Sequence, residues 1–157
     1  MLNTSLCYIE KDGCWLMQHR VKKKNDLNHE KWIGVGGKFE EGETPEECVL
    51  REAEEETGLK LDSLSYRGII TFLSDRWEGE YMHLFTSDRF HGELSSDCSE
   101  GDLVWVKKED VFALPIWEGD KLFLSRILSD GAFFTMKLVY EGDRLVGSEE
   151  HEYGESK

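Results

Sequence analysis

The 157-residue sequence predicts an α+β fold, an α/β/α sandwich in which a mixed central sheet carries a helix on each face. Strand-like apolar runs recur along most of the chain, and they supply the sheet. Two helical stretches separate them: one at 45–57 has start and stop signals, and one at 119–129 has apolar residues at helical spacing. With 39% hydrophobic residues, the chain is long enough to bury a core, so we expect a single domain over residues 1–157.

The sequence predicts strands, turns and short helices along the rest of the chain. The first two strands flank an Asp12-Gly13 turn, and a polar loop at 21–31 follows them. The stretch 108–113 is expected to form one or two helical turns, and the polar tail at 148–157 to be frayed. Runs rich in β-branched and aromatic residues predict strands at 6–10, 14–20, 32–39, 66–73, 81–87, 103–106 and 133–140.

The first helix has the clearest local signals. Thr44 is a favourable N-cap, and Pro45 suits the first helical position. Glu47 stands where the second half of a capping box is needed, and Gly58 stands where a left-handed C-cap is needed. The helix is therefore expected from about residue 45 to about residue 57.

This helix carries an unusual group of acids. Glu52, Glu55 and Glu56 are three and four residues apart, so they project from one side of the helix, while Val49 and Ala53 can pack on the sheet. Close carboxylates repel one another unless a cation neutralises them, and Mg²⁺ or Mn²⁺ prefers oxygen ligands. The alternative is a solvated acidic face, which is the usual meaning of a charge run.

The wider pattern distinguishes these two interpretations. Residues 37–59 read GKFEEGETPEECVLREAEEETGL and contain the spacing G-x5-E-x7-R-E-x-x-E-E-x-G. A solvated acidic face has no need of Gly37, Glu43 and Arg51 at fixed distances before and within the helix. The stretch resembles the Nudix box of the Nudix hydrolases at every fixed position, and this resemblance implies the Nudix fold.

The resemblance also implies roles for individual residues. Arg51 is expected to pair with a box glutamate and orient it, and that partner is expected to be Glu43. Either Glu52 or Glu55 is expected to position or deprotonate the attacking water, and the choice between them stays open. The expected metal ligands are the Gly37 carbonyl and the carboxylates of Glu52, Glu55 and Glu56.

The net charge of −14 excludes several classes of partner. Duplex DNA or an anionic membrane would need a basic footprint, so neither is expected as a partner. No apolar run approaches 18 residues and no signal peptide is visible, and Cys7, Cys14, Cys48 and Cys98 lack CxxC spacing. A cytoplasmic location is therefore expected. A nucleotide substrate remains compatible, because metal would bind the acids first and phosphate would follow.

A second resemblance covers the chain from Cys7 to about Val146. The segments LMQHRVKKKND, HEKWIGVGGK, WEGD and FFTMKLVYEGD are similar to segments of the MutT-type 8-oxo-dGTP diphosphatases. In that group adjacent acids often read the oxidised purine, and an Asn often precedes the glycine turn. Here Gly119 replaces one of the acids and Ile33 replaces the Asn, which affects base specificity and leaves the reaction class unchanged.

A purine pocket needs apolar walls and a few placed polar groups. Trp117, Phe72 and Tyr81 are candidate walls, and Asp120 can bond a base edge, although each could equally serve the core or a helix start. Basic residues just before the glycine turn could meet phosphate or form a solvated loop. The candidate substrate-binding residues are Trp117, Asp120, Phe72, Tyr81, Ile33, Leu27, Lys23 and Lys38. Glu100 is the candidate for a further metal ligand, and Glu93 and Asp97 are alternatives to it. Each could instead be a solvated acid in a loop.

These observations predict a Mg²⁺-dependent nucleoside triphosphate pyrophosphohydrolase, with Mn²⁺ as an alternative metal. Its expected substrate is 8-oxo-dGTP, cleaved to the monophosphate and pyrophosphate. One alternative is a Nudix hydrolase of ADP-ribose, a dinucleotide or an RNA 5′ end. A ligand sensor without catalysis is the other, although sensors usually lose the box glutamates that this chain retains.

Overall fold

The structure is a computed structural model that describes residues 1–21, 28–95 and 102–154. Within these ranges, no helix is long and apolar enough to cross a membrane. The strands are β1 (Leu2–Lys11), β2 (Cys14–His19), β3 (Trp32–Ile33), β4 (Lys60–Leu61), β5 (Ser65–Ser74), β6 (Glu80–Ser87), β7 (Phe90–His91), β8 (Asp102–Lys107), β9 (Phe134–Glu141) and β10 (Arg144–Glu152). The helices are α1 (Pro45–Thr57), α2 (Lys108–Val111) and α3 (Glu118–Leu128).

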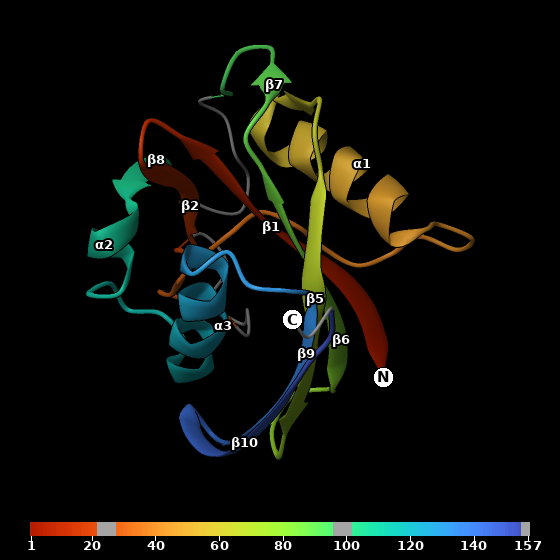
Figure 1. The fold of residues 1–157 in the computed structure, drawn as a ribbon, viewed down its shortest axis with the longest axis vertical. Helices are drawn as coiled ribbons and strands as arrows, with labels where there is room; N and C mark the ends of the chain where they lie inside the picture. Colours follow the sequence, from red (N-terminus) through yellow and green to blue (C-terminus); the bar gives the residue numbers. More distant parts are fainter. Residues whose placement is uncertain (22–27, 96–101, 155–157) are drawn as a thin grey trace.

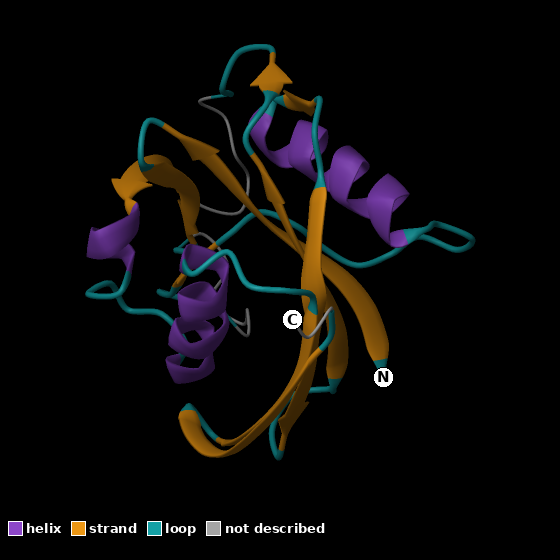
Figure 2. Ribbon diagram, in the orientation of Figure 1, coloured by secondary structure: helices purple, strands orange, loops and turns teal. Residues whose placement is uncertain are grey.

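The main sheet is mixed, as predicted (Figures 1 and 2). Its strands follow the order β10-β9-β5-β6-β1-β2-β3, and β8 also pairs with β2. Strands β1 and β6 run parallel, as do β5 and β9, whereas the other neighbouring pairs are antiparallel. The predicted strands at 66–73 and 81–87 correspond to β5 and β6, which pair with each other. Outside this sheet, β4 and β7 form a short antiparallel ladder near the end of α1.

Strand β1 divides the core into two layers, because successive side chains of a strand point to opposite faces. Cys7 and Ile9 pack with Val49 and Ala53 of α1 on one face. Leu6 and Tyr8 face the other way and join a cluster that includes residues of α3. Each helix therefore covers one face of the sheet, which confirms the predicted sandwich of an α+β fold.

Helix α1 begins and ends as its sequence predicts. The backbone N–H of Glu47 donates to the Thr44 hydroxyl, and the Glu47 carboxylate accepts the Thr44 N–H, which completes the capping box. At the other end Gly58 has φ +80° and donates its N–H to the carbonyl of Glu54. These local bonds set where the helix begins and ends.

The C-terminal region differs from the prediction. The strand at 133–140 was expected to be the last, but β10 follows it and pairs antiparallel with β9. The tail expected to fray from residue 148 instead belongs to this strand as far as Glu152. Most of β10 is exposed at the sheet edge, so its sequence lacks the apolar alternation that identifies a half-buried strand.

Candidate active site

The glycine loop before α1 lies directly against β1. A Cβ atom on Gly36 would stand 1.9 Å from the carbonyl oxygen of Ser5, so no other residue fits there without moving the backbone. A Cβ atom on Gly37 would stand 2.6 Å from the carboxylate carbon of Glu52. The absence of a side chain therefore lets the Glu52 carboxylate lie against the Gly37 backbone.

Arg51 is the centre of an ionic network on α1. Its Nε and Nη2 donate to the two oxygens of Glu43 at 2.7 and 2.9 Å. Its Nη1 donates to Glu52 at 2.9 Å and to Glu55 at 3.2 Å, and Nη2 also reaches the carbonyl of Lys38. The hydrogen bonds from Arg51 lower the pKa of Glu43 to about 2, so Glu43 remains an anion over any ordinary pH range. The arginine thus ties the loop to three carboxylates.

Glu56 has a different position from its neighbours. Its side chain is buried, and Oε2 accepts the backbone N–H of Gly36 at 2.9 Å. By contrast, 59% of the Glu55 side chain is exposed, and 17% of the Glu52 side chain. The three predicted metal-ligand glutamates therefore range from a buried anchor to a solvent-facing carboxylate.

The donor set of the box fits a hard divalent cation. Every predicted ligand atom is an oxygen, from the Gly37 carbonyl and the carboxylates of Glu52, Glu55 and Glu56, and Mg²⁺ prefers such ligands. Across residues 1–21, 28–95 and 102–154, no three acidic, histidine or cysteine side chains are grouped closely enough to hold a metal ion. Arg51 holds Glu52 and Glu55, so both would have to turn from it to receive a cation.

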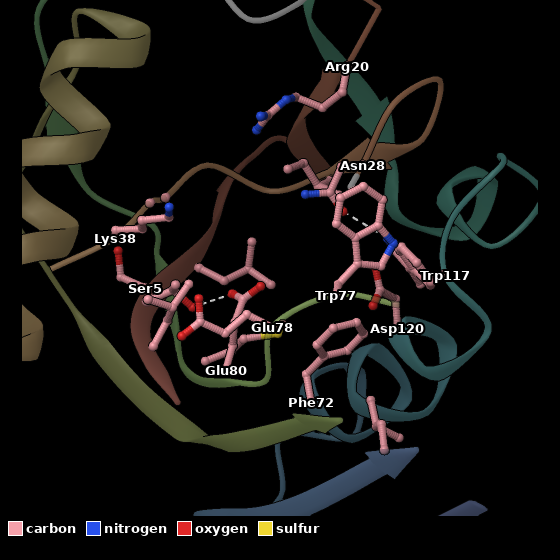
Figure 3. Close-up of a pocket in the computed structure, with 18 of the residues that line it drawn as sticks. Ser5, Arg20, Asn28, Lys38, Phe72, Trp77, Glu78, Glu80, Trp117 and Asp120 are labelled. Atoms are coloured by element: carbon pink, nitrogen blue, oxygen red, sulfur yellow. Dashed lines mark hydrogen bonds between the residues drawn. The ribbon is translucent and has the colours of Figure 1, made fainter. Parts of the chain in front are cut away.

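A cavity of about 900 Å³ extends from the box across the face of the sheet on which α3 packs (Figure 3). Lys38 and Ser5 lie toward one side in this view, and Phe72, Trp117 and Asp120 lie together toward the other. Gly37 and Glu52 also line it, so a ligand in the cavity reaches the box. The remaining lining residues are Leu2, Thr4, Leu6, Arg20, Asn28, Ile33, Gly36, Trp77, Glu78, Glu80, Met82, Leu138 and Tyr140.

Aromatic rings form the far wall of this cavity. The ring of Trp117 meets that of Phe72 edge-on at 5.8 Å and that of Tyr140 at 4.9 Å between centroids. Trp117 Nε1 donates to the Asn28 side chain at 2.8 Å, and the Lys31 ammonium lies 4.8 Å from the Trp117 ring centroid. These contacts fix the indole in place, as a rigid wall for a planar ligand requires.

Asp120 supplies a buried carboxyl group to the same wall. Only 6% of the residue is exposed. Burial raises the pKa of Asp120 to about 8, and the positive charge of Lys31 offsets part of that rise. At neutral pH the group therefore holds a proton in the free protein, and it can donate as well as accept a hydrogen bond.

The structure brings most of the predicted site residues together. Gly37, Glu43, Arg51, Glu52, Glu55 and Glu56 meet in the box, and Ile33, Lys38, Phe72, Trp117 and Asp120 line the cavity. Tyr81 does not join them: it is 40% exposed, whereas its neighbours Glu80 and Met82 line the cavity. The period of two along β6 turns Tyr81 to the opposite face. Leu27, Lys23, Glu100 and Asp97 lie outside the described residues, and Glu93 is exposed.

Sequence reasoning missed several lining residues. Glu80 and Met82 come from β6, Leu138 and Tyr140 from β9, and Asn28 from the loop after β2. Alternation along each strand could have grouped the members of each pair, since residues i and i+2 share a face. The sequence pattern did not reveal that β5 and β9 run side by side.

Comparison with known proteins identifies the family. Residues 2–127 match the NUDIX domain family. The chain therefore belongs to the Nudix family, whose hydrolases act on pyrophosphate bonds and generally use divalent metals such as Mg²⁺. The solved structure of a MutT protein from Bacillus halodurans is 26% identical, with a TM-score of 0.84 over 96% of this chain and 97% of that one.

The curated relatives include hydrolases named for different substrates. The uncharacterized Nudix hydrolase YvcI of Bacillus subtilis is 36% identical over 57% of this chain and 59% of that protein, less than two thirds of its length. The oxidized purine nucleoside triphosphate hydrolase of Mus musculus is 31% identical over 71% of each chain. The NAD-capped RNA hydrolase NudC of Photobacterium profundum is 33% identical over 66% of this chain but only 36% of that protein.

Proposed function

We propose that this protein is a Mg²⁺-dependent pyrophosphohydrolase of oxidised purine nucleoside triphosphates, with 8-oxo-dGTP as the preferred substrate. The carrying observation is the cavity that joins the Nudix box to an aromatic wall with a buried acid. Gly37 and Glu52 line it together with Phe72, Trp117 and Asp120. The likeness to the mouse oxidized purine nucleoside triphosphate hydrolase over 71% of the chain supports the same substrate class.

The cavity offers different chemistry to the two ends of a nucleotide. Phe72 and Trp117 provide apolar surface for a purine, and Asp120 provides a carboxyl group for its edge. Lys38 and Arg20, which also line the cavity, offer cationic groups to the phosphates. A base against the aromatic wall would place its phosphates toward the box.

The box residues would carry the hydrolysis. A divalent cation held by the Gly37 carbonyl and the carboxylates of Glu52, Glu55 and Glu56 would neutralise charge on the phosphates. Glu52 or Glu55 would accept a proton from water as the water oxygen bonds to phosphorus. The P–O bond to the departing pyrophosphate would break, which leaves the nucleoside monophosphate. Arg51, fixed by its two bonds to Glu43, would keep the helix carboxylates oriented.

The likeness to NudC makes capped RNA a second candidate substrate. It favours an RNA 5′ end over other Nudix substrates, because this relative is named for the hydrolysis of NAD-capped RNA. The alignment with NudC covers only 36% of that protein, and this limited coverage weakens the candidate. The open cavity can accept a base in either case.

A substrate panel tests the proposal. Initial rates with Mg²⁺ would be measured for 8-oxo-dGTP, dGTP, ADP-ribose, NAD and NAD-capped RNA, with products separated by chromatography. We expect the highest kcat/KM for 8-oxo-dGTP, with 8-oxo-dGMP and pyrophosphate as products. A higher kcat/KM for NAD-capped RNA would replace this assignment with the second candidate, and no hydrolysis of any compound would favour the sensor.

The same panel with Glu55→Gln and Glu52→Gln proteins locates the chemistry. Loss of a general base or metal ligand is expected to lower kcat by about 10²–10⁴-fold. Glu54→Gln, on the same helix but outside the fixed box positions, is the matched control and should retain the parental rate. Full activity in both box variants would place the chemistry elsewhere.

A further inference from the structure

Tyr140 and Gly119 meet at the base end of the cavity. Gly119 lies in the first turn of α3, where backbone N–H groups have no partner within the helix. Its N–H donates to the Tyr140 hydroxyl at 2.7 Å, and both groups are buried. Tyr140 comes from β9, so this bond links the start of α3 to the sheet under the cavity.

The same contact explains why the residue at 119 is glycine. A Cβ atom there would stand 2.6 Å from a methyl group of Leu138 and 2.7 Å from the Tyr140 oxygen. A larger acidic side chain would have to displace both. The phenol and the leucine therefore occupy the space that a second acid beside Asp120 would need.

The phenol has one hydrogen-bonding direction left for a ligand. Its oxygen accepts from Gly119, so its own proton is directed to another acceptor. Burial and the nearby Asp120 carboxyl raise the pKa of Tyr140 well above its ordinary value, so the group keeps its proton. Tyr140 lines the cavity beside Asp120, Phe72 and Trp117. It is thus a permanent donor at the place where a base would stack.

We propose that the Tyr140 hydroxyl reads the base, by donating a hydrogen bond to the carbonyl oxygen at position 6 of an oxopurine while Asp120 accepts the neighbouring ring N–H. The edge that all 6-oxopurines share is thus read by a phenol and one carboxyl group in place of two acids. This inference rests on the proposed function, since it requires a purine nucleotide in the cavity.

A purely structural role for Tyr140 is the competing explanation. The Gly119–Tyr140 bond caps α3, whose N-cap residue Trp117 supplies no capping side chain. Removing the hydroxyl could then loosen the helix and slow every substrate equally. A test must therefore compare the variant with the parent on substrates that carry the carbonyl the phenol would contact and on one that lacks it.

The experiment uses the Tyr140→Phe protein and three triphosphates. dGTP and 8-oxo-dGTP carry the oxygen at position 6, and 2-aminopurine deoxyriboside triphosphate lacks both that oxygen and the N1–H, so each rate of the variant is divided by the parent's rate on the same compound. We expect kcat/KM to fall roughly tenfold for both oxopurines, chiefly through KM, and to change little for the 2-aminopurine compound. Tyr153→Phe is the control: the ring of Tyr153 contacts Phe133, and Tyr153 does not line the cavity.

The outcomes separate the two claims. An equal fall in kcat/KM for all three compounds would assign Tyr140 a structural role and overturn the inference. A fall confined to 8-oxo-dGTP would also overturn it, because the contact would then lie at position 8. An unchanged rate for all three also overturns it. If the parent protein hydrolyses none of the compounds, the proposed function fails first. Thermal unfolding of each variant shows whether it is folded at the assay temperature.

Discussion

Arg51 and Glu43 form a two-pronged ion pair, with Nε and Nη2 of the arginine 2.7 and 2.9 Å from the two carboxylate oxygens. Glu43 precedes α1 and Arg51 lies within it, so the pair closes the loop onto the helix. The other guanidinium nitrogen contacts Glu52 and Glu55. The orientation of the proposed catalytic carboxylates thus depends on a residue with planar, forked donors.

Arg51→Lys tests this dependence. Lysine keeps the charge but cannot donate two parallel bonds, so we expect kcat to fall by about 10- to 100-fold, as for other residues that orient metal ligands. The measurement is steady-state hydrolysis of 8-oxo-dGTP. Arg126→Lys is the control, because Arg126 pairs with Glu150 and Glu152 outside the site. Equal rates in the two variants would show that the fork has no role.

Gly37→Ala tests the close approach of the loop to Glu52. The added methyl group would stand 2.6 Å from the Glu52 carboxylate carbon and push it from its place. We expect kcat to fall by about tenfold or more, with weaker Mg²⁺ binding by calorimetry. Gly147→Ala is the matched control, since its nearest non-neighbouring atom would lie at 3.8 Å. Retained activity and metal affinity in Gly37→Ala would contradict the proposed site geometry.

Asp120→Asn tests the buried carboxyl through stability. The pKa of Asp120 is raised to about 8 from an ordinary value of 3.8, so its ionisation favours the unfolded chain. Compared with an acid whose pKa is unshifted, Asp120 therefore stabilises the folded protein fully below pH 3.8. This stabilisation is lost as the pH rises toward 8. Asparagine does not titrate. We therefore expect the free energy of unfolding of the variant, relative to the parent, to increase by about 1 kcal/mol per unit between pH 6 and 8.

Urea unfolding at pH 6, 7 and 8 provides that measurement. The parent and the Asp120→Asn protein would be compared in the same buffers, so that titration of the other acids cancels. A difference that is constant with pH would mean that Asp120 ionises normally.

Trp117→Ala tests the aromatic wall. Loss of a stacking surface is expected to raise KM for 8-oxo-dGTP by roughly tenfold or more with a smaller change in kcat, because the proposed site places the indole against the base and not against the phosphates. Trp105→Ala, which removes a ring stacked on Phe90 outside the cavity, is the control. If KM rises equally in both proteins, the wall is not at Trp117.

The sequence predicted the box well because its geometry is local. The capping box, the C-cap glycine and the i, i+3, i+4 glutamates all follow from the periodicity of one helix. The pairing of Arg51 with Glu43 was predicted from the family resemblance, and the structure confirms that contact.

The base end of the cavity depends on long-range pairing instead. Phe72 lies opposite Leu138 across the parallel pair of β5 and β9, a neighbourhood that no local pattern reveals. Tyr81 was placed in the pocket although it points away, because a one-residue shift on a strand exchanges the two faces. Strand β10 escaped prediction because its exposed, polar residues show no apolar alternation.

An internal competition assay tests the central claim most directly. The protein would be given equal concentrations of 8-oxo-dGTP and dGTP with Mg²⁺, and both would be followed by chromatography, so that their relative decay gives the ratio of kcat/KM. The account predicts that 8-oxo-dGTP disappears at least about tenfold faster, with 8-oxo-dGMP and pyrophosphate formed in equal amounts. Equal decay of the two nucleotides, or faster decay of dGTP, would contradict it.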